Sequence, residues 1–227
     1  MNRCTRAALL ILAAGAAAAA LMLVTGRLRS ASSEQALGGY STSLEGRGAE
    51  QLFNIVRAAR RLDGAVVLPG REFSLAAVLG DTGPGQGWRQ AQMIRGGVVE
   101  QAVAGGICQV SSTLYNAALS SGMQITERHA HSRPVASVPP GRDATLARGI
   151  ADLRFRNGRE HPVRIRAVAR GERLSVTILG AGERPVRYRF SVEQRRLRGA
   201  LLVSLWRTDP DGTRTMVSCD EYETARD

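Results

Sequence analysis

Hydrophobic residues recur along the chain with two spacings, which predict two helices and many short strands. Residues 50–62 carry apolar side chains at helical spacing, which predicts an amphipathic helix. Residues 104–122 show the same spacing after a pair of glycines, and Gly122 is well placed to end this second helix. Short apolar or alternating runs predict strands at residues 65–68, 123–128, 153–156, 163–168, 174–179, 187–193, 200–208 and 213–221, and a hairpin within residues 91–103.

These elements predict an α+β fold, a single mixed domain in which a cysteine-bearing helix packs on β-strands. The length of 227 residues is enough to bury a sizeable core. We divide the chain into an N-terminal membrane anchor or signal segment at residues 1–26, a linker at 27–39, a main domain at 40–182 and a β-rich C-terminal extension at 183–227.

The N-terminal segment predicts a membrane location. Residues 7–24 form an uncharged apolar run that follows Arg3 and Arg6, and a transmembrane helix needs about 20 such residues. The two arginines would stay in the cytoplasm, so we expect a single-pass transmembrane helix with the main domain outside the cell membrane. Positive charge also follows the run, and cleavage near residues 31–33 would instead release a secreted protein.

Composition argues against nucleic acid as a partner. The net charge of +11 comes entirely from arginine, since the chain has no lysine, and the arginines are scattered along its length. Nucleic-acid binders concentrate basic residues on one face beside aromatic stacking partners, whereas aromatic residues make up only 4% of this chain. A positive surface would still attract anionic polymers of the cell envelope or lipid head groups.

Three cysteines fall in different settings. Cys4 precedes the apolar run and would face the cytoplasm, whereas Cys108 and Cys219 would lie together outside, where a disulfide between them is permitted. None of the three belongs to a C-x-x-C pair of the kind that binds metals. The glycine-rich stretch at residues 80–87 lacks the Gly-Lys-Ser/Thr step of a phosphate-binding loop, so we interpret it as a turn-rich loop.

Cys108 is the strongest candidate for chemistry because it lies in the first turn of a predicted helix. Unsatisfied backbone N–H groups and the positive end of the helix dipole stabilise a thiolate there. The same N–H groups, with those of Gly105 and Gly106, can donate to the oxyanion that forms when a thiolate attacks an acyl carbon. A cysteine at a helix start is, however, more often a small core residue.

A nucleophilic cysteine needs a proton-transfer partner, and His129 or His131 can provide it. Asp143 or Glu127 can orient the chosen imidazole, which would complete a Cys, His, acid arrangement. The same histidines and Cys108 also suggest a zinc site, but a second cysteine and a nearby fourth ligand are missing. We therefore expect neither a metal nor another cofactor.

Three motifs resemble those of a known family: GGICQVSSTLYNAAL at residues 105–119, ERHAHSRPV at 127–135 and VPPGRDAT at 138–145. Together they resemble the VanW family, which takes its name from an accessory protein encoded in some vancomycin-resistance clusters. YSTSL at residues 40–44 and LPGREFSL at 68–75 extend the resemblance over roughly residues 40–180. Ala104 stands where the family usually has a third glycine.

The resemblance implies an activity, because VanW domains have been linked to peptidoglycan L,D-transpeptidation. Cys108 would attack the carbonyl of the third stem-peptide residue, expel the terminal D-alanine and pass the acyl group to a neighbouring amine. His131 or His129 would be the acid/base, with Asp143 beside it. The residues expected to contact the substrate are Gly105, Gly106, Gln109, Ser111, Ser112 and Arg142, the last as a clamp for a peptide carboxylate.

Two other functions are compatible with the same residues. The chain can be a non-enzymatic envelope module that binds peptidoglycan or glycopeptide, with these motifs building only a groove. Alternatively, Cys108 and Cys219 can form a redox-regulated disulfide. In each case the expected partners are peptidoglycan stem peptides and the membrane, and the sequence does not specify an oligomeric state.

Overall fold

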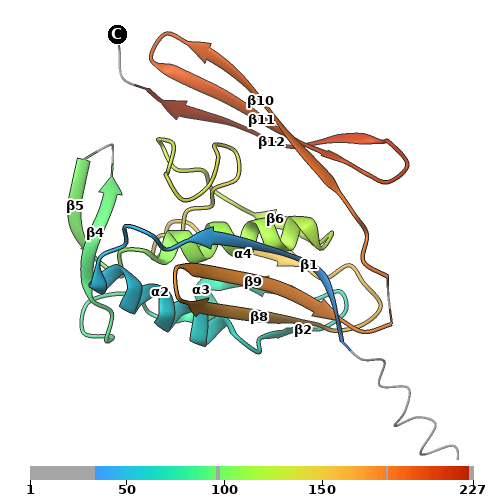
Figure 1. Cartoon of the computed structure of the whole chain (residues 1–227), viewed down its shortest axis with the longest axis horizontal. Coiled ribbons are helices and arrows are strands. Elements are labelled where there is room, and N and C mark those ends of the chain that lie inside the picture. Colours follow the sequence, from blue (N-terminus) through green and yellow to red (C-terminus); the bar gives the residue numbers. More distant parts are fainter. Residues whose placement is uncertain (1–33, 96–97, 183, 225–227) are drawn as a thin grey trace, which may run out of the picture. The chain divides into compact units, whose positions relative to one another are not determined.

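The computed structural model of the chain describes residues 34–95, 98–182 and 184–224 (Figure 1). Three helices lie in these segments: α2 (Ala49–Leu62), α3 (Leu75–Leu79) and α4 (Ile107–Ser120). The strands are β1 (Gln35–Ser43), β2 (Val66–Val67), β3 (Glu72–Ser74), β4 (Gln90–Arg95), β5 (Val98–Val103), β6 (Gln124–Glu127), β7 (Arg154–Arg156), β8 (Val163–Arg170), β9 (Arg173–Gly180), β10 (Arg189–Leu197), β11 (Ala200–Thr208) and β12 (Arg214–Glu223). The two predicted long helices and the predicted strands are thus confirmed, with shifted ends.

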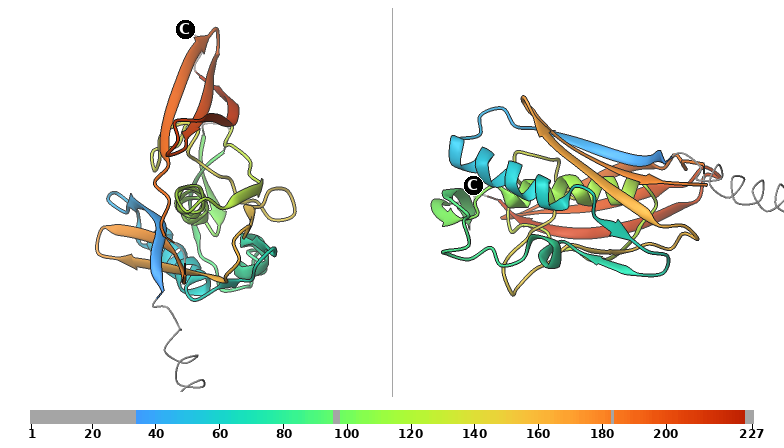
Figure 2. Two further views of the ribbon diagram at one scale, coloured as in Figure 1. Left: turned by 90° about the vertical axis from the view of Figure 1, so that its right-hand side faces the viewer. Right: turned by 90° about the horizontal axis from the view of Figure 1, so that it is seen from below.

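The largest sheet of the described residues has the strand order β1-β9-β8-β2, and its neighbouring strands are antiparallel. Alternate residues of β8 are buried and exposed, as a strand with one solvent-facing side requires. The buried face packs against two helices, α2 over β8 and α4 over β1 and β9 (Figure 2). The core of the protein lies between this sheet and the helices.

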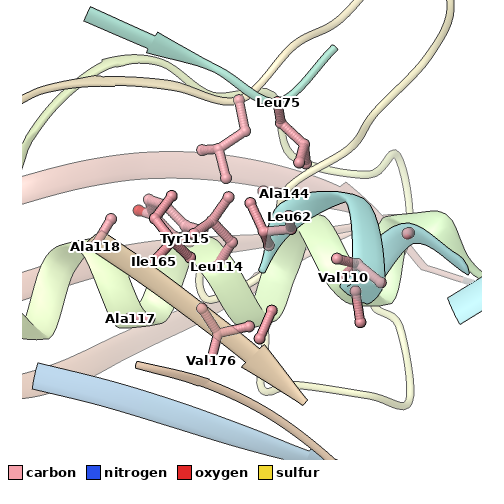
Figure 3. Packing of buried hydrophobic residues seen from close by; sticks show 14 of the residues in the cluster. Leu62, Leu75, Val110, Leu114, Tyr115, Ala117, Ala118, Ala144, Ile165 and Val176 are labelled. Atoms are coloured by element: carbon pink, nitrogen blue, oxygen red, sulfur yellow. The ribbon is translucent and has the colours of Figure 1, made fainter. Parts of the chain in front are cut away.

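Helix α4 is buried on nearly every side. The apolar side chains that predicted it, Val110, Leu114, Ala117 and Ala118, are all fully buried. The close-up in Figure 3 shows these residues packed near Leu62 of α2, Leu75 of α3, Ile165 of β8 and Val176 of β9. Polar residues on other faces of α4 are buried as well, so this helix runs through the interior rather than along the surface.

Smaller sheets surround this core. Strands β3, β7 and β6 form one three-stranded antiparallel sheet, and β4 and β5 form the hairpin predicted within residues 91–103. The last three strands form the sheet β10-β11-β12, which we call the C-terminal sheet. Its β11 buries Leu201, Val203 and Leu205.

Strand β1 begins at Gln35, inside the stretch interpreted from sequence as a linker. Two consecutive glycines, Gly38 and Gly39, and polar neighbours give this stretch the composition of a linker. Gly38 is needed for packing instead: a Cβ atom there would lie 2.5 Å from the carbonyl carbon of Ser120 at the end of α4. The close approach of β1 to α4 requires a residue without a side chain.

The predicted fold class needs correction. We expected an α+β domain built around one cysteine-bearing helix, but strands hold 41% of the residues and helices 18%. The physical reason is that the helices are short, with at most 14 residues, whereas β1 and the C-terminal sheet add strands of nine or ten residues. The molecule is mostly β-sheet.

The predicted N-terminal transmembrane helix is not supported either. Within the segments that the structure describes, every helix is too short or too polar to cross a bilayer. Residues 7–24, on which that prediction was based, lie outside the described residues.

The role of Gly38 can be tested by Gly38→Ala. The added methyl group collides with the backbone of Ser120, so we expect the free energy of unfolding to fall by about 2 kcal/mol. Gly158→Ala is the matched control, because a Cβ atom there meets no heavy atom within 4 Å. Urea denaturation followed by circular dichroism measures both changes, and equal stability of the two variants would contradict this account of β1 packing.

Candidate active site

Cys108 lies in the first turn of α4, which begins after a tight backbone reversal. Gly106, the residue that caps the helix, has φ +102°, a left-handed conformation that favours glycine. A Cβ atom on Gly105 would lie 2.6 Å from the carbonyl oxygen of Ala91, so the hairpin also approaches too closely for any other residue. The two glycines therefore set the position at which Cys108 emerges.

Ala104 adds strain next to this turn. It has φ +62° and is the one residue other than glycine with positive φ in the described part of the chain. A left-handed alanine costs about 1–2 kcal/mol, and this position is the one at which the sequence lacks the expected third glycine. Ala104 is also buried, so its methyl group contributes packing that a glycine would lose.

An extended segment, residues 142–146, runs antiparallel along α4 and touches it once per helical turn. The three helix residues that make these contacts are spaced four apart, so their side chains lie on one face of α4. The contacts are Asn116 Nδ2 donating to the carbonyl of Arg142 at 2.6 Å, the amide of Ala144 donating to Ser112 Oγ at 3.0 Å, and Cys108 Sγ donating to the carbonyl of Leu146 at 3.5 Å. These three contacts thus hold the segment along the side of α4, with Leu146 next to Cys108.

Asp143 lies in this segment and accepts hydrogen bonds from His131. One oxygen, Oδ2, accepts both the backbone N–H and ring Nδ1 of His131, each at 2.7 Å. The other oxygen, Oδ1, accepts the hydroxyl of Tyr222 at 2.5 Å and a guanidinium N–H of Arg128 at 3.1 Å. Burial alone would raise the pKa of the Asp143 carboxyl, but these donors and the charge of Arg128 hold it below its usual value.

His131 in turn connects Asp143 to Cys108. Burial would lower the pKa of this imidazole, but its hydrogen bonds to Asp143 and to Cys108, together with their negative charges, raise the pKa to about 9. Because Nδ1 bonds Asp143, the other ring nitrogen, Nε2, is the one available to Cys108. At neutral pH the site therefore contains a protonated imidazole paired with the carboxylate of Asp143.

Comparison with known proteins agrees with the motifs. The family model described as "VanW like protein" matches residues 50–179, more than half of the chain. The chain belongs to the VanW family. Cys108, His131 and Asp143, which we call the relay, all lie within the matched region.

Two curated relatives support this assignment. The chain is 40% identical to the uncharacterized protein YoaR of Bacillus subtilis (strain 168) over 155 residues, which cover 68% of this chain and 51% of YoaR. It is 28% identical to the vancomycin B-type resistance protein VanW of Enterococcus faecalis (strain ATCC 700802 / V583) over 112 residues, 47% of this chain and 41% of that protein. The chain thus spans about half the length of these relatives, and no solved structure matches it.

The structure separates the two histidines between which the sequence did not decide. His129 has a side chain that is 49% exposed, and its Nε2 lies 3.1 Å from Glu127. His131 is 18% exposed and faces Asp143. Residues 128–131 are not in a strand, and the two side chains have different partners and different exposure. Geometry therefore favours His131 as the partner of Cys108 and leaves Glu127 with His129.

Neither the zinc site nor the disulfide is present in this arrangement. In residues 34–95, 98–182 and 184–224, no group of three or more His, Cys, Asp and Glu side chains is placed to hold a metal ion. Cys108 and Cys219 both have free thiols, Cys108 half-buried at the site and Cys219 exposed on β12.

Several residues expected to contact substrate lie in the interior of this VanW domain. Gln109, Ser111 and Ser112 are buried. The amide of Gln109 donates to Thr42 Oγ1 at 2.9 Å and to the carbonyl of Ser43 at 2.7 Å, which fastens α4 to β1. Of the predicted set, Gly105 and Gly106 remain next to Cys108.

Arg142 also has a structural environment. Its guanidinium lies over the rings of Tyr40, at 5.5 Å, and Phe190, at 4.7 Å from the ring centroids. Burial lowers the pKa of Arg142 below its usual value. The side chain thus joins β1 to β10 through cation–π contacts.

Sequence reasoning missed three residues of the site. The side chain of Arg128 is 6% exposed, and its guanidinium reaches both Asp143 and Asp220, although the ERHAH motif contained it. Tyr222 and Asp220 lie on β12, beyond the region that the VanW family model matches. Asp220 lies inside the strand predicted at residues 213–221 and Tyr222 just after it, and nothing in that pattern indicated a role at the site.

The raised pKa of His131 makes part of the stability depend on pH. Its folded pKa of about 9 exceeds the ordinary value of 6.5, so the charged imidazole stabilises the native state fully below about pH 6.5. This contribution is lost as the pH rises through about 9. We expect the free energy of unfolding of the wild type, minus that of His131→Asn, to fall by about 3 kcal/mol between pH 6 and pH 9.5. Urea unfolding at both pH values measures it, and a constant difference would contradict the assignment.

Proposed function

We propose that this VanW protein is a cysteine acyltransferase of the cell envelope that modifies peptidoglycan by L,D-transpeptidation. The observation that carries the proposal is the pair in which Asp143 Oδ2 lies 2.7 Å from His131 Nδ1, together with Cys108 as one of the groups that raise the pKa of this imidazole. A nucleophile, an acid/base and an orienting carboxylate in this order recur on unrelated folds that perform acyl transfer.

The electrostatics support a charged nucleophile. A protonated His131 next to Cys108 stabilises the negative charge of a thiolate, and so does the N-terminal end of α4, where N–H groups have no acceptor within the helix. The buried carboxylate of Asp143 keeps the imidazole in the orientation that presents Nε2 to the sulfur. We assign the backbone N–H of Cys108, in the first turn, as a donor to the developing oxyanion.

The reaction proceeds in two acyl transfers. The Cys108 thiolate attacks the carbonyl carbon of the third stem-peptide residue and forms a C–S bond. As the C–N bond to the terminal D-alanine breaks, His131 gives its proton to the leaving amine. The amine of a neighbouring stem then attacks the thioester and loses a proton to His131, which releases the thiolate and restores the starting state.

The choice of substrate depends on family membership and on chemistry. The resemblance of the GGICQ and HAH motifs is to domains linked to peptidoglycan cross-linking, and a relative is named as a vancomycin B-type resistance protein. The linked cross-linking activity implies peptidoglycan stem peptides, which carry the D-alanine that the proposed reaction expels. Since this substrate lies outside the cytoplasmic membrane, we propose an extracytoplasmic location for the domain.

Incubation of the purified full-length protein with a disaccharide tetrapeptide tests the proposal. The expected product is an adduct on the peptide that contains Cys108, with the mass of the muropeptide less that of D-alanine. Cys108→Ala should abolish the adduct, and Cys219→Ala, which changes an exposed thiol on β12, should leave it unchanged. Binding of the muropeptide without any adduct would favour the non-enzymatic peptidoglycan-binding function instead.

The two histidines offer a matched pair of variants. His131→Asn removes the proton-transfer group next to Cys108, so we expect the rate of adduct formation to fall by about 100-fold or more. His129→Asn changes a side chain that is 49% exposed and faces Glu127, and its rate should stay within about twofold of the wild type. Rapid-quench mass spectrometry gives both rates, and similar losses in the two variants would exclude His131 as the specific acid/base.

A further inference from the structure

We propose that the C-terminal sheet is a working part of the catalytic centre, with Tyr222 as a positioning residue that fixes the carboxylate of Asp143 so that it can orient His131. The inference rests on the proposed roles of Cys108, His131 and Asp143. It assigns a function to strands that lie beyond the region matched by the family model, residues 50–179.

The hydroxyl of Tyr222 has two partners that fix its direction. The amide of Gly141 donates to the hydroxyl oxygen at 2.7 Å, and the hydroxyl in turn lies 2.5 Å from Asp143 Oδ1. A carboxylate can only accept, so the phenol proton points at Asp143. Tyr222 is fully buried, and burial with the charge of Asp143 raises the pKa of the phenol, so it remains a donor.

The two oxygens of Asp143 accept hydrogen bonds from different residues, and together these bonds fix the plane of the carboxylate. Oδ2 serves His131 alone, through the ring and the backbone N–H. Oδ1 is held from the opposite side by Tyr222 and Arg128. Removal of the phenol hydroxyl would leave Arg128, at 3.1 Å, as the side-chain donor to Oδ1, and the carboxylate could turn away from the imidazole.

Other contacts tie the sheet to both segments that carry the relay. Asp220 pairs with Arg128, and the backbone N–H of Glu223 donates to the carbonyl of Ser132 at 2.7 Å. On the other segment, a Cβ atom at Gly141 would lie 2.9 Å from a methyl carbon of Val203 in β11. Figure 1 shows the yellow-green loops of these segments next to β12. The sheet thus holds His131 and Asp143 against each other.

The experiment measures the alkylation rate of Cys108 by iodoacetamide at pH 7, read by peptide mass spectrometry in the full-length protein. Tyr222→Phe removes only the hydroxyl, and we expect the rate at Cys108 to fall about tenfold. Cys219, exposed on the same strand, is an internal reference for the reagent concentration, and circular dichroism shows whether the sheet stays folded. Tyr188→Phe, which removes a phenol hydroxyl near Gly122, is the matched control and should have no effect.

A double-mutant cycle with Asp143→Asn separates positioning from a general loss of structure. If Tyr222 acts through Asp143, Tyr222→Phe should change the rate little once Asp143 is already Asn. Additive effects, or an unchanged or faster rate in Tyr222→Phe alone, would overturn the inference. Should Tyr222→Phe unfold the sheet, Asp220→Asn replaces it, since it weakens the same cluster from the side of Arg128 and should also slow Cys108 alkylation.

These readouts need no peptidoglycan substrate, so they are independent of the proposed acyl transfer. A non-additive cycle without an acyl adduct would retain Tyr222 as a positioning residue and reject the transpeptidase. An acyl adduct with an additive cycle would retain the transpeptidase and reject the role of the C-terminal sheet.

Discussion

The structure of the site depends on one buried carboxylate. An ionised group taken out of water costs several kcal/mol unless nearby donors and positive charges compensate it. Asp143 is 1% exposed and accepts from four N–H or O–H groups, which come from His131, Arg128 and Tyr222. Because these donors come from residues 128–131 and from Tyr222 on β12, the cost of burying Asp143 is offset only when these chain segments have come together. The carboxylate therefore links the folded state to the geometry of the relay.

Helix α4 is the rigid element against which that geometry is built. Its apolar residues are buried in the core between the largest sheet and the other helices, so the position of Cys108 follows from packing rather than from a flexible loop. The polar residues Ser112 and Asn116 face the segment 142–146 and bond its backbone at successive turns. The hydrogen bonds of the buried Ser112 and Asn116 thus fix the position of Asp143 along the axis of α4, whereas the glycines fix the position of Cys108.

The sequence predicted the elements that have a local pattern of residues. It did not predict the features that depend on contacts between residues far apart in the chain. The helix of residues 104–122 and its cysteine were recognisable from spacing and from two glycines. Strand β1 was not, since Gly38 looks like a linker residue until the end of α4 is seen 2.5 Å from its missing Cβ. The choice between His129 and His131 needed the position of Asp143, and Tyr222 is 79 residues from the carboxylate that it contacts. No periodicity connects such residues.

The charges around the relay explain why its parts belong together. Asp220 balances Arg128, and Asp143 balances a protonated His131, so this buried cluster is close to neutral before the thiol ionises. A thiolate at Cys108 adds one negative charge, which the imidazolium and the N-terminal end of α4 stabilise. If Asp143 lost its own donors, its charge would be less well compensated and would compete with the thiolate for the imidazolium proton. In the proposed mechanism, the hydrogen bond that Tyr222 donates to Asp143 and the ion pair of Asp220 with Arg128 therefore act on the sulfur through the balance of charge as well as through position.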